Sequence, residues 1–300
     1  MPAIIASTSH DIDIDGLNLH AEVAGSGPPV VLVHGFTGSG ASWRSLVPVL
    51  APDFTTIAVD LVGHGRSGCP VAIERYRMRR AVDDLAALLR ALGHERAAWL
   101  GYSLGGRVAL QVAVHRPEVV SALVLEGATP GLPTPEERAA RVAADEALAQ
   151  RLEREGLTAF VDYWQSIPLW DSQRRTLTEA QRAALRAGRL AQHPVGLAGS
   201  LRGMGTGAQD WVGDRLAELR VPVLLTAGTL DRKFSDIARE MAGTLPDRTM
   251  HLIEDAGHAA HLEQPDAFNA VVREFLLKVR ARLDRKSTRL NSSHVALSRM

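Results

Sequence analysis

The sequence predicts an α/β protein, with a mostly parallel sheet flanked by helices and a helical insertion. Three observations support this. Short apolar runs alternate with helical patterns along most of the 300 residues. A serine between two glycines stands where a strand meets a helix. From Thr129 to about Asp214 the alternation stops and the chain becomes helical. We therefore expect a core built from residues 1–128 and 215–283, interrupted by a helical cap of residues 129–214.

The composition limits the possible functions. Apolar residues make up 46% of the chain and charged residues 23%, which allows a sizeable core. The formal net charge is zero, and no basic block precedes the extreme C-terminus, so we expect neither a nucleic-acid partner nor an anionic membrane surface. Cys69 is the single cysteine, which excludes an internal disulfide. No leader stands at Met1–Ile14 and no long apolar run occurs, so we expect no membrane insertion and a cytoplasmic location.

The C-terminus has a different character. Asp284–His294, DRKSTRLNSSH, resembles one reading frame of a common sequencing adapter, and Ser298–Met300 fits its continuation. We interpret residues 284–300 as a non-native tail, not as a basic arm. The alternative is a natural disordered tail. The tail holds more basic than acidic residues, so the rest of the chain is mildly acidic.

The first elements form a hairpin followed by parallel strands. Alternating apolar residues on either side of Asp15-Gly16 predict an antiparallel hairpin. The apolar run Val30–Val33 is typical of a strand buried on both faces. Further along we expect a helix at Gly40–Leu50, a strand at Thr55–Val59, a tight loop at Asp60–Ser67 and a helix at Tyr76–Leu92.

The serine between two glycines fits a nucleophile elbow. Ala97–Gly101 is expected to be a buried strand and Leu104–His115 a helix, so Ser103 falls on the turn between them. Such a turn strains the serine backbone and requires small neighbours, here Gly101 and Gly105. A chance match is the alternative, but strand, turn and helix all agree.

The second half returns to alternation after the insertion. We expect strands at Ala122–Leu125, Val221–Ala227 and Thr249–Ile253, and helices at Ser235–Ala242 and from Pro265 to about Leu283. The insertion starts just past the carboxyl end of a strand, where open α/β sheets bind ligands. It is therefore expected to cover Ser103 and to exclude water.

A serine hydroxyl needs a histidine as base, and the histidine needs an acid that fixes its tautomer. His258 follows the last strand in a loop, and Asp231 follows the strand before it, which gives the chain order serine, acid, histidine. Two positions are alternates for the histidine, His261 and His34, and Glu126 is the alternate acid. The alternative for Asp231 is an ordinary surface carboxylate with no catalytic role.

The loop His34–Gly38 follows the first parallel strand, and its glycines let backbone N–H groups approach a ligand. We expect the Phe36 and Leu104 amides to form an oxyanion hole. A structural turn is the alternative. The sequence holds no Cys/His cluster with metal spacing and no phosphate-binding glycine loop, so we expect no metal and no cofactor.

These features predict a capped serine enzyme of the α/β-hydrolase fold. From the residues alone, the reaction could be hydrolysis of a small ester or of a carbon–carbon bond. A binding protein that merely kept the fold is a competing class. An oxyanion loop and an intact order of serine, acid and histidine argue against it, because a receptor needs neither.

Four longer motifs narrow the interpretation: His34–Ser39, Gly101–Arg107, Pro130-Gly131-Leu132 and Ser200–Gly207. Together with Asp231-Arg232-Lys233-Phe234 they resemble the 2-succinyl-6-hydroxy-2,4-cyclohexadiene-1-carboxylate synthases of menaquinone biosynthesis. The resemblance runs from about Val30 to Leu277. It implies a lyase that eliminates pyruvate from 2-succinyl-5-enolpyruvyl-6-hydroxy-3-cyclohexene-1-carboxylate by proton abstraction, without an acyl-enzyme. Pro133 departs from the family pattern, because some relatives carry glutamine there.

Such a substrate is a small molecule with several carboxylates, which arginine binds through two parallel hydrogen bonds. Arg107 stands one helical turn after Ser103 and should point into the cleft. The resemblance adds a further set of substrate-binding residues: Tyr102, Arg141, Trp164, Arg189 and Lys233. For the two cap arginines, Arg141 and Arg189, a solvated position on a helix face is the alternative.

Overall fold

The computed structural model describes residues 6–297, and side chains through residue 285. Within these residues the centre is an eight-stranded sheet, ordered β1-β2-β4-β3-β5-β6-β7-β8. β1 and β2 form an antiparallel hairpin, β2 pairs antiparallel with β4, and the other neighbours pair in parallel. The strands are β1 Ser7–Ile14, β2 Leu17–Ala24, β3 Pro29–Val33, β4 Thr55–Val59, β5 Ala97–Tyr102, β6 Val120–Glu126, β7 Val223–Gly228 and β8 Arg248–Ile253.

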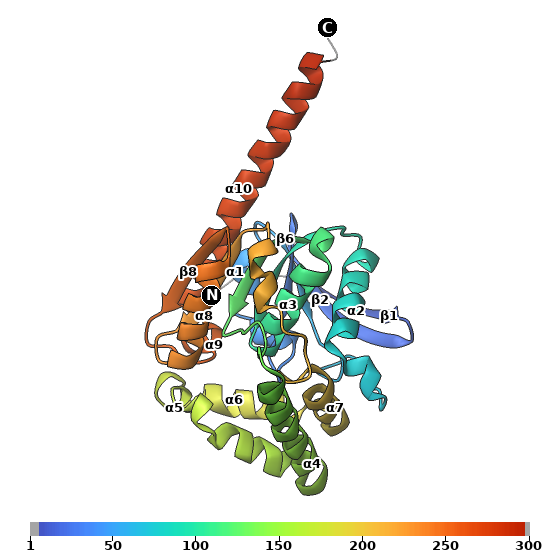
Figure 1. Ribbon diagram of the computed structural model, residues 1–300, viewed down its shortest axis with the longest axis vertical. Helices are drawn as coiled ribbons and strands as arrows, with labels where there is room; N and C mark the ends of the chain where they lie inside the picture. Colours follow the sequence, from blue (N-terminus) through green and yellow to red (C-terminus); the bar gives the residue numbers. More distant parts are fainter. Residues whose placement is uncertain (1–5, 298–300) are drawn as a thin grey trace.

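Helices cover both faces of the sheet (Figure 1). Along β3, Val31 and Val33 belong to the apolar core under α2, α3 and α8, while Val30 and Leu32 belong to the core under α1 and α10. A strand whose alternate residues enter two cores is apolar throughout, as the sequence suggested. These helices are α1 Val47–Leu50, α2 Met78–Ala91, α3 Leu104–His115, α8 Arg232–Thr244 and α10 Pro265–Leu297, with the short α9 Ala260–Glu263 before the last.

Between β6 and β7 the chain forms a helical cap at the end of the molecule away from the projecting part of α10 (Figure 1). α4 and α7 of the cap share a separate apolar core that includes Phe160 and Leu201. α7 also packs closely on the sheet domain, since a Cβ at Gly196 would lie 2.0 Å from the Gly63 carbonyl oxygen. The cap elements are α4 Pro135–Ser166, which breaks at Gly156, α5 Gln173–Thr176, α6 Glu179–Leu190 and α7 Pro194–Met204.

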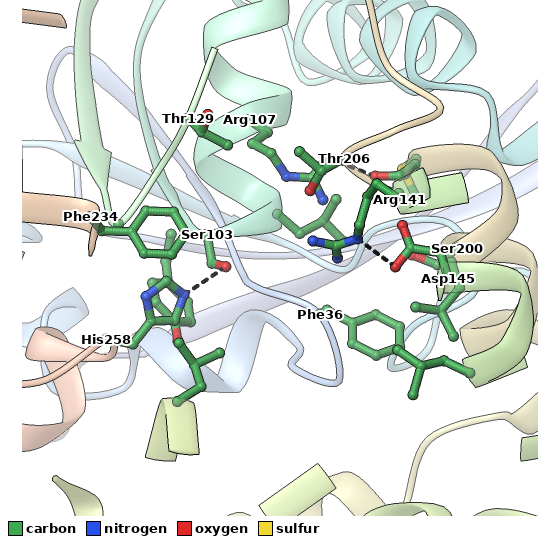
Figure 2. Close-up of a pocket in the computed structure, with 18 of the residues that line it drawn as sticks. Phe36, Ser103, Arg107, Thr129, Arg141, Asp145, Ser200, Thr206, Phe234 and His258 are labelled. Atoms are coloured by element: carbon green, nitrogen blue, oxygen red, sulfur yellow. Dashed lines mark hydrogen bonds and ion pairs between the residues drawn. The ribbon is translucent and has the colours of Figure 1, made fainter. Parts of the chain in front are cut away.

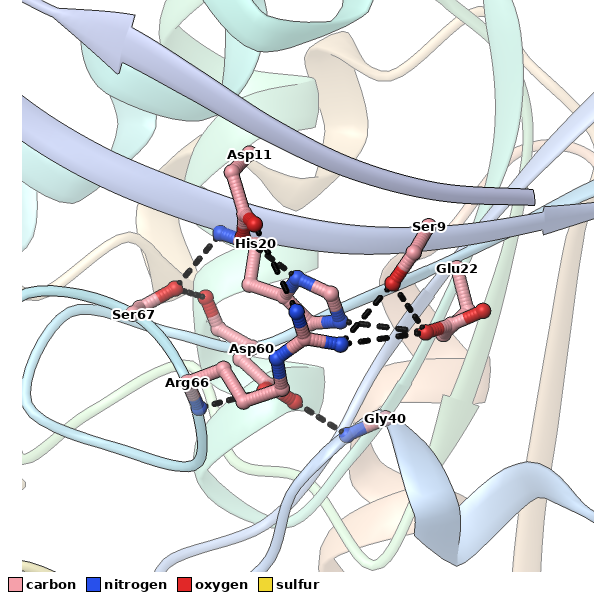
Figure 3. Close-up of polar contacts among 8 residues, drawn as sticks. All are labelled: Ser9, Asp11, His20, Glu22, Gly40, Asp60, Arg66 and Ser67. Carbon is pink, nitrogen blue, oxygen red and sulfur yellow. Dashed lines mark hydrogen bonds and ion pairs between the residues drawn. The ribbon is translucent and has the colours of Figure 1, made fainter.

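A polar network fixes the loop that follows β4 (Figure 3). The Asp60 carboxylate accepts the Gly40 N–H at 2.6 Å and the Arg66 N–H at 2.8 Å. The Ser67 hydroxyl donates to the Asp60 carbonyl oxygen at 2.6 Å and accepts the His20 N–H at 2.9 Å. The hairpin and the loop beneath the cap are thereby tied together.

Several predicted elements differ from the observed ones. The expected helix Gly40–Leu50 is a 3-10 turn, Gly40–Trp43, followed by the short α1, because Pro48 cannot continue a helix through its interior. β7 begins at Val223, after Pro222, which has no N–H to pair. α10 does not end near Leu283 but continues to Leu297 as a helix that projects from the body (Figure 1). The residues at 298–300, part of the interpreted tail, lie outside the described residues.

Candidate active site

Ser103 stands in a strained turn between β5 and α3. Its φ of 51° and ψ of −108° are unusual for a residue with a side chain. A Cβ at Gly101 would lie 2.1 Å from the Gly105 carbonyl oxygen, and a Cβ at Gly105 would lie 2.1 Å from that of Val33. The two glycines therefore let the turn pack against itself and against β3, which leaves Ser103 at the carboxyl end of the sheet.

Ser103, His258 and Asp231 are joined by hydrogen bonds. His258 Nε2 lies 3.0 Å from Ser103 Oγ, and His258 Nδ1 lies 2.7 Å from Asp231 Oδ2. Asp231 is the N-cap residue of α8, and its Oδ1 accepts the Phe234 N–H at 3.3 Å. Because a carboxylate only accepts, Nδ1 carries the hydrogen toward Asp231, and Nε2 is free to accept the Ser103 proton.

The alternate residues have other partners. His261 Nδ1 lies 2.9 Å from Glu126 Oε2, and both side chains are fully buried. His34 Nδ1 donates to the Gly35 carbonyl oxygen at 2.8 Å, while its Nε2 accepts the Leu61 N–H at 3.0 Å. Ser103 is therefore bonded to neither alternate histidine in the structure.

A cavity of about 190 Å³ opens beside Ser103 and His258 (Figure 2). Phe36 and Leu104, the two predicted oxyanion-hole residues, line it with them. Leu104 is the first residue of α3, so its N–H has no acceptor within the helix. Tyr102, Arg107, Arg141, Trp164 and Lys233 also line this cavity.

Arg107 enters the cavity from α3 and is only 9% exposed. Its Nη1 donates to the Met204 carbonyl oxygen at 2.8 Å and to Gln209 Oε1 at 2.5 Å. Within the described residues no carboxylate lies within ion-pair distance of this guanidinium. Burial, and then the charge of Arg141, lower the pKa of Arg107 to about 9. A buried cation held by neutral acceptors can still pair with a carboxylate from a ligand.

Arg141 reaches the same cavity from α4, opposite His258 (Figure 2). Its Nε donates to Asp145 Oδ1 at 2.9 Å, while the other oxygen of Asp145 is buried and has no hydrogen-bond partner in the part of the chain that the structure describes. Burial raises the pKa of Asp145, although the charge of Arg141 and its hydrogen bond oppose the shift. Arg141 is thus oriented by a carboxylate of the cap itself.

Arg189 lines a second cavity, of about 340 Å³, which shares Phe36, Tyr102 and Trp170 with the first. Its guanidinium lies 5.1 Å from the centre of the Trp170 ring. The Tyr102 hydroxyl is buried and has no hydrogen-bond partner among the described residues, and burial raises the pKa of Tyr102. The predicted substrate-binding residues are therefore divided between two adjoining cavities.

Two negative findings apply to the part of the chain that the structure describes. No group of three or more His, Cys, Asp or Glu side chains is placed to hold a metal ion. No helix in that part has the length and apolar character needed to cross a membrane.

Comparisons with known proteins agree with this architecture. The family model for the alpha/beta hydrolase fold matches residues 28–265. The putative 2-succinyl-6-hydroxy-2,4-cyclohexadiene-1-carboxylate synthase of Bacillus subtilis is 46% identical over 86% of this chain and 94% of its own length. The synthase of Pectobacterium atrosepticum is 35% identical, over 86% of this chain and 97% of its own length. The chain belongs to this synthase family.

Solved structures support the same placement. The structure of MenH from S. aureus superimposes with a TM-score of 0.83 at 30% identity, covering 87% of this chain and 98% of that one. A thermophilic esterase from Thermogutta terrifontis, in a malate-bound structure, has a TM-score of 0.78 at 30% identity, covering 92% of this chain and 99% of its own. The predicted family and the predicted α/β-hydrolase fold are confirmed.

The structure gives a physical reason for the cap motif of this synthase, Met204–Gly207. The Met204 carbonyl oxygen holds Arg107. A Cβ at Gly207 would lie 2.5 Å from the Arg138 carbonyl oxygen and 3.0 Å from Arg141 Cβ, so the glycine lets the motif pack on α4 beside Arg141. The motif therefore supports both arginines that enter the first cavity.

Sequence reasoning missed the residues that orient those arginines, Asp145 and Gln209. Asp145 stands four residues after Arg141 on α4, a spacing at which ion pairs form, and that spacing was the available signal. Nothing in the sequence pattern pointed to Gln209, because it reaches Arg107 from a loop about a hundred positions away. Pro133, the departure from the family pattern, is exposed and lines neither cavity.

Proposed function

We propose that this synthase eliminates pyruvate from 2-succinyl-5-enolpyruvyl-6-hydroxy-3-cyclohexene-1-carboxylate to give 2-succinyl-6-hydroxy-2,4-cyclohexadiene-1-carboxylate, with Ser103, His258 and Asp231 as the catalytic triad. One observation carries the proposal. A serine bonded to a histidine shares a cavity with a buried arginine that has no carboxylate partner among the described residues. The similarity to the synthases of B. subtilis and P. atrosepticum supports the choice of substrate.

The reaction requires a base and a place for negative charge. His258 takes the Ser103 proton, and Ser103 Oγ removes the ring proton next to the succinyl ketone. The released electron pair makes an enolate, whose oxygen the Phe36 and Leu104 amides would stabilise. The electrons then return through the ring and the C–O bond to the enolpyruvyl group breaks. Enolpyruvate leaves with that electron pair, takes up a proton and becomes pyruvate.

The charge of the substrate explains the cations. Its name implies three carboxylates. Arg107 and Arg141 line the first cavity, and Arg44 and Arg189 line the second. Of these four, Arg107, Arg141 and Arg189 are the proposed carboxylate ligands. Guanidinium groups bind carboxylates through two parallel hydrogen bonds and keep their charge in a partly buried site. Tyr102, Trp164 and Lys233 complete the proposed substrate contacts. The proposal includes no metal, no cofactor and no nucleic-acid partner.

The test is direct. Purified protein is incubated with the enolpyruvyl adduct, and pyruvate release is followed with a coupled dehydrogenase. We expect catalytic release that is lost in Ser103→Ala. Absence of pyruvate release, together with Ser103-dependent hydrolysis of a small ester, would overturn the elimination in favour of a serine hydrolase. The cytoplasmic location stays a prediction, which fractionation of cells would test.

A further inference from the structure

The backbone on both sides of His258 is held by one buried carboxylate. Glu263 Oε2 accepts the Gly257 N–H at 2.9 Å, and Glu263 Oε1 accepts the Ala259 N–H at 3.3 Å. Glu263 is 5% exposed. The two oxygens therefore accept hydrogen bonds from the backbone N–H groups of the residue before and the residue after His258.

The cap touches the same carboxylate. The Thr176 hydroxyl, on α5, lies 3.1 Å from Glu263 Oε2. This hydroxyl also lies 3.1 Å from the Ser172 carbonyl oxygen, but only the Glu263 contact leaves the cap. A second contact lies beside it, since a Cβ at Gly257 would come within 1.9 Å of Ser172 Oγ. The first turn of α5 thus rests directly on the loop that carries His258.

We propose that Glu263 is a positioning residue. It fixes the backbone on both sides of His258 and holds the cap, through Thr176, against the loop that carries His258. His258 must meet Ser103 and Asp231 at the same time, at 3.0 and 2.7 Å. Small displacements of a catalytic group lower rates strongly, so the loop needs a rigid support. Glu263 supplies that support to the loop and, through Thr176, ties the cap that covers the substrate to the same point.

Both oxygens of Glu263 are needed. The Gly257 and Ala259 N–H groups approach different oxygens, and a glutamine has only one. Its NH₂ group would then face a backbone N–H in a buried place, and two donors cannot satisfy each other. Glu263→Gln keeps the size of the side chain and removes one acceptor, which makes it the sharpest single change.

This inference rests on the proposed function for its kinetic readout, so a second readout needs no substrate. The kinetic experiment measures kcat, KM and Tm for Glu263→Gln and Thr176→Val. Glu240→Gln, an exposed change on α8, and Thr176→Ser, which keeps the hydroxyl, are the controls. The substrate-free readout is the low-field proton resonance of the His258–Asp231 hydrogen bond.

We expect Glu263→Gln to lower kcat by about tenfold or more with little change in KM, and to shift or broaden the resonance. Thr176→Val should lower kcat by about threefold, and Thr176→Ser should restore it. Wild-type kcat and resonance in a folded Glu263→Gln protein would overturn the proposal. If that variant does not fold, wild-type kcat in Thr176→Val would overturn it. If the unmodified protein releases no pyruvate, the proposed function fails, and the resonance alone decides the role of Glu263.

Discussion

Gly205 lies directly against Asp145, because a Cβ at position 205 would stand 2.4 Å from Asp145 Oδ2. The same Cβ would lie 2.4 Å from the Leu201 carbonyl oxygen. Gly205 has a φ of −56°, which any residue can adopt, so space and not backbone conformation requires a glycine here. The end of α7 thereby sets the position of the carboxylate that orients Arg141.

Gly205→Ala should therefore damage substrate binding. The new methyl group must push Asp145 or the last turn of α7, which moves Arg141 away from a bound carboxylate. We expect kcat/KM for pyruvate release to fall by about tenfold or more, mainly through KM. Gly243→Ala on α8 is the matched control, since among the described residues its added Cβ would meet nothing within 4 Å beyond its chain neighbours and its own helix backbone. Equal kinetics in the two variants would contradict the packing argument.

Ser103→Ala should remove the base. We expect elimination to fall by about three orders of magnitude or more, while the protein stays folded. If Ser103 acts as a base and not as a nucleophile, intact-mass spectrometry of the unmodified protein during turnover should show no covalent adduct. An acyl-enzyme that accumulates would instead favour a serine hydrolase.

Two buried histidines should make the fold sensitive to acid. Burial lowers the pKa of His34 to about 4 and that of His64 to about 3. Protonation would turn the acceptor Nε2 of His34 into a donor facing the Leu61 N–H, and that of His64 into a buried donor without a partner.

The sign follows from these pKa values. An unfolded histidine titrates near 6.5, so between pH 6.5 and 4 the unfolded chain binds more protons than the folded chain. The free energy of unfolding therefore decreases as the pH is lowered through this range. Over this pH range, each of the two histidines should lower the free energy of unfolding of the protein by on the order of 2–4 kcal/mol. Urea unfolding at pH 7 and pH 4.5 measures the effect. His64→Gln should reduce it, and the exposed His193→Gln should not.

Truncation after Leu283 should leave folding and activity unchanged. Among the described side chains, the last α10 residue of the buried apolar core is Val279, which is 6% exposed, while Leu283 is 44% exposed. Beyond it, α10 projects from the body (Figure 1). A helical segment that projects from the body adds little stability. Thermal unfolding and pyruvate release of the truncated protein should match the full chain, and a clearly lower Tm would contradict the interpretation of residues 284–300 as a non-native tail.

Much of the architecture could be predicted because its signals are local. Gly101 and Gly105 on either side of Ser103 predict the turn, and apolar runs predict the strands. The ends of helices and strands were harder to predict. Pro48, for example, breaks a helix that the apolar spacing favours. Gln209 and Glu263 were not predictable, because they act through contacts that only the folded chain creates. A carboxylate or an amide on a loop has no periodic pattern that distinguishes support from a solvated surface.

Arg107 offers the sharpest test of a substrate with several carboxylates. Ser103 and Arg107 are four residues apart at the start of α3, and Arg107 is held by the Met204 carbonyl oxygen and Gln209. Loss of a desolvated pair between arginine and carboxylate costs about 2–5 kcal/mol. Arg107→Ala should therefore lower kcat/KM for the enolpyruvyl adduct by about a hundredfold or more.

Two comparisons separate recognition from folding. Arg107→Lys should restore only part of the activity, because an ammonium group cannot make two parallel hydrogen bonds. Hydrolysis of a small neutral ester, where it can be measured, should change little in Arg107→Ala, because that substrate has no carboxylate to bind. Loss of both activities together with a lower Tm would mean that Arg107 mainly holds Met204 and Gln209 in place. Near-normal kcat/KM for the adduct would mean that no substrate carboxylate binds at Arg107.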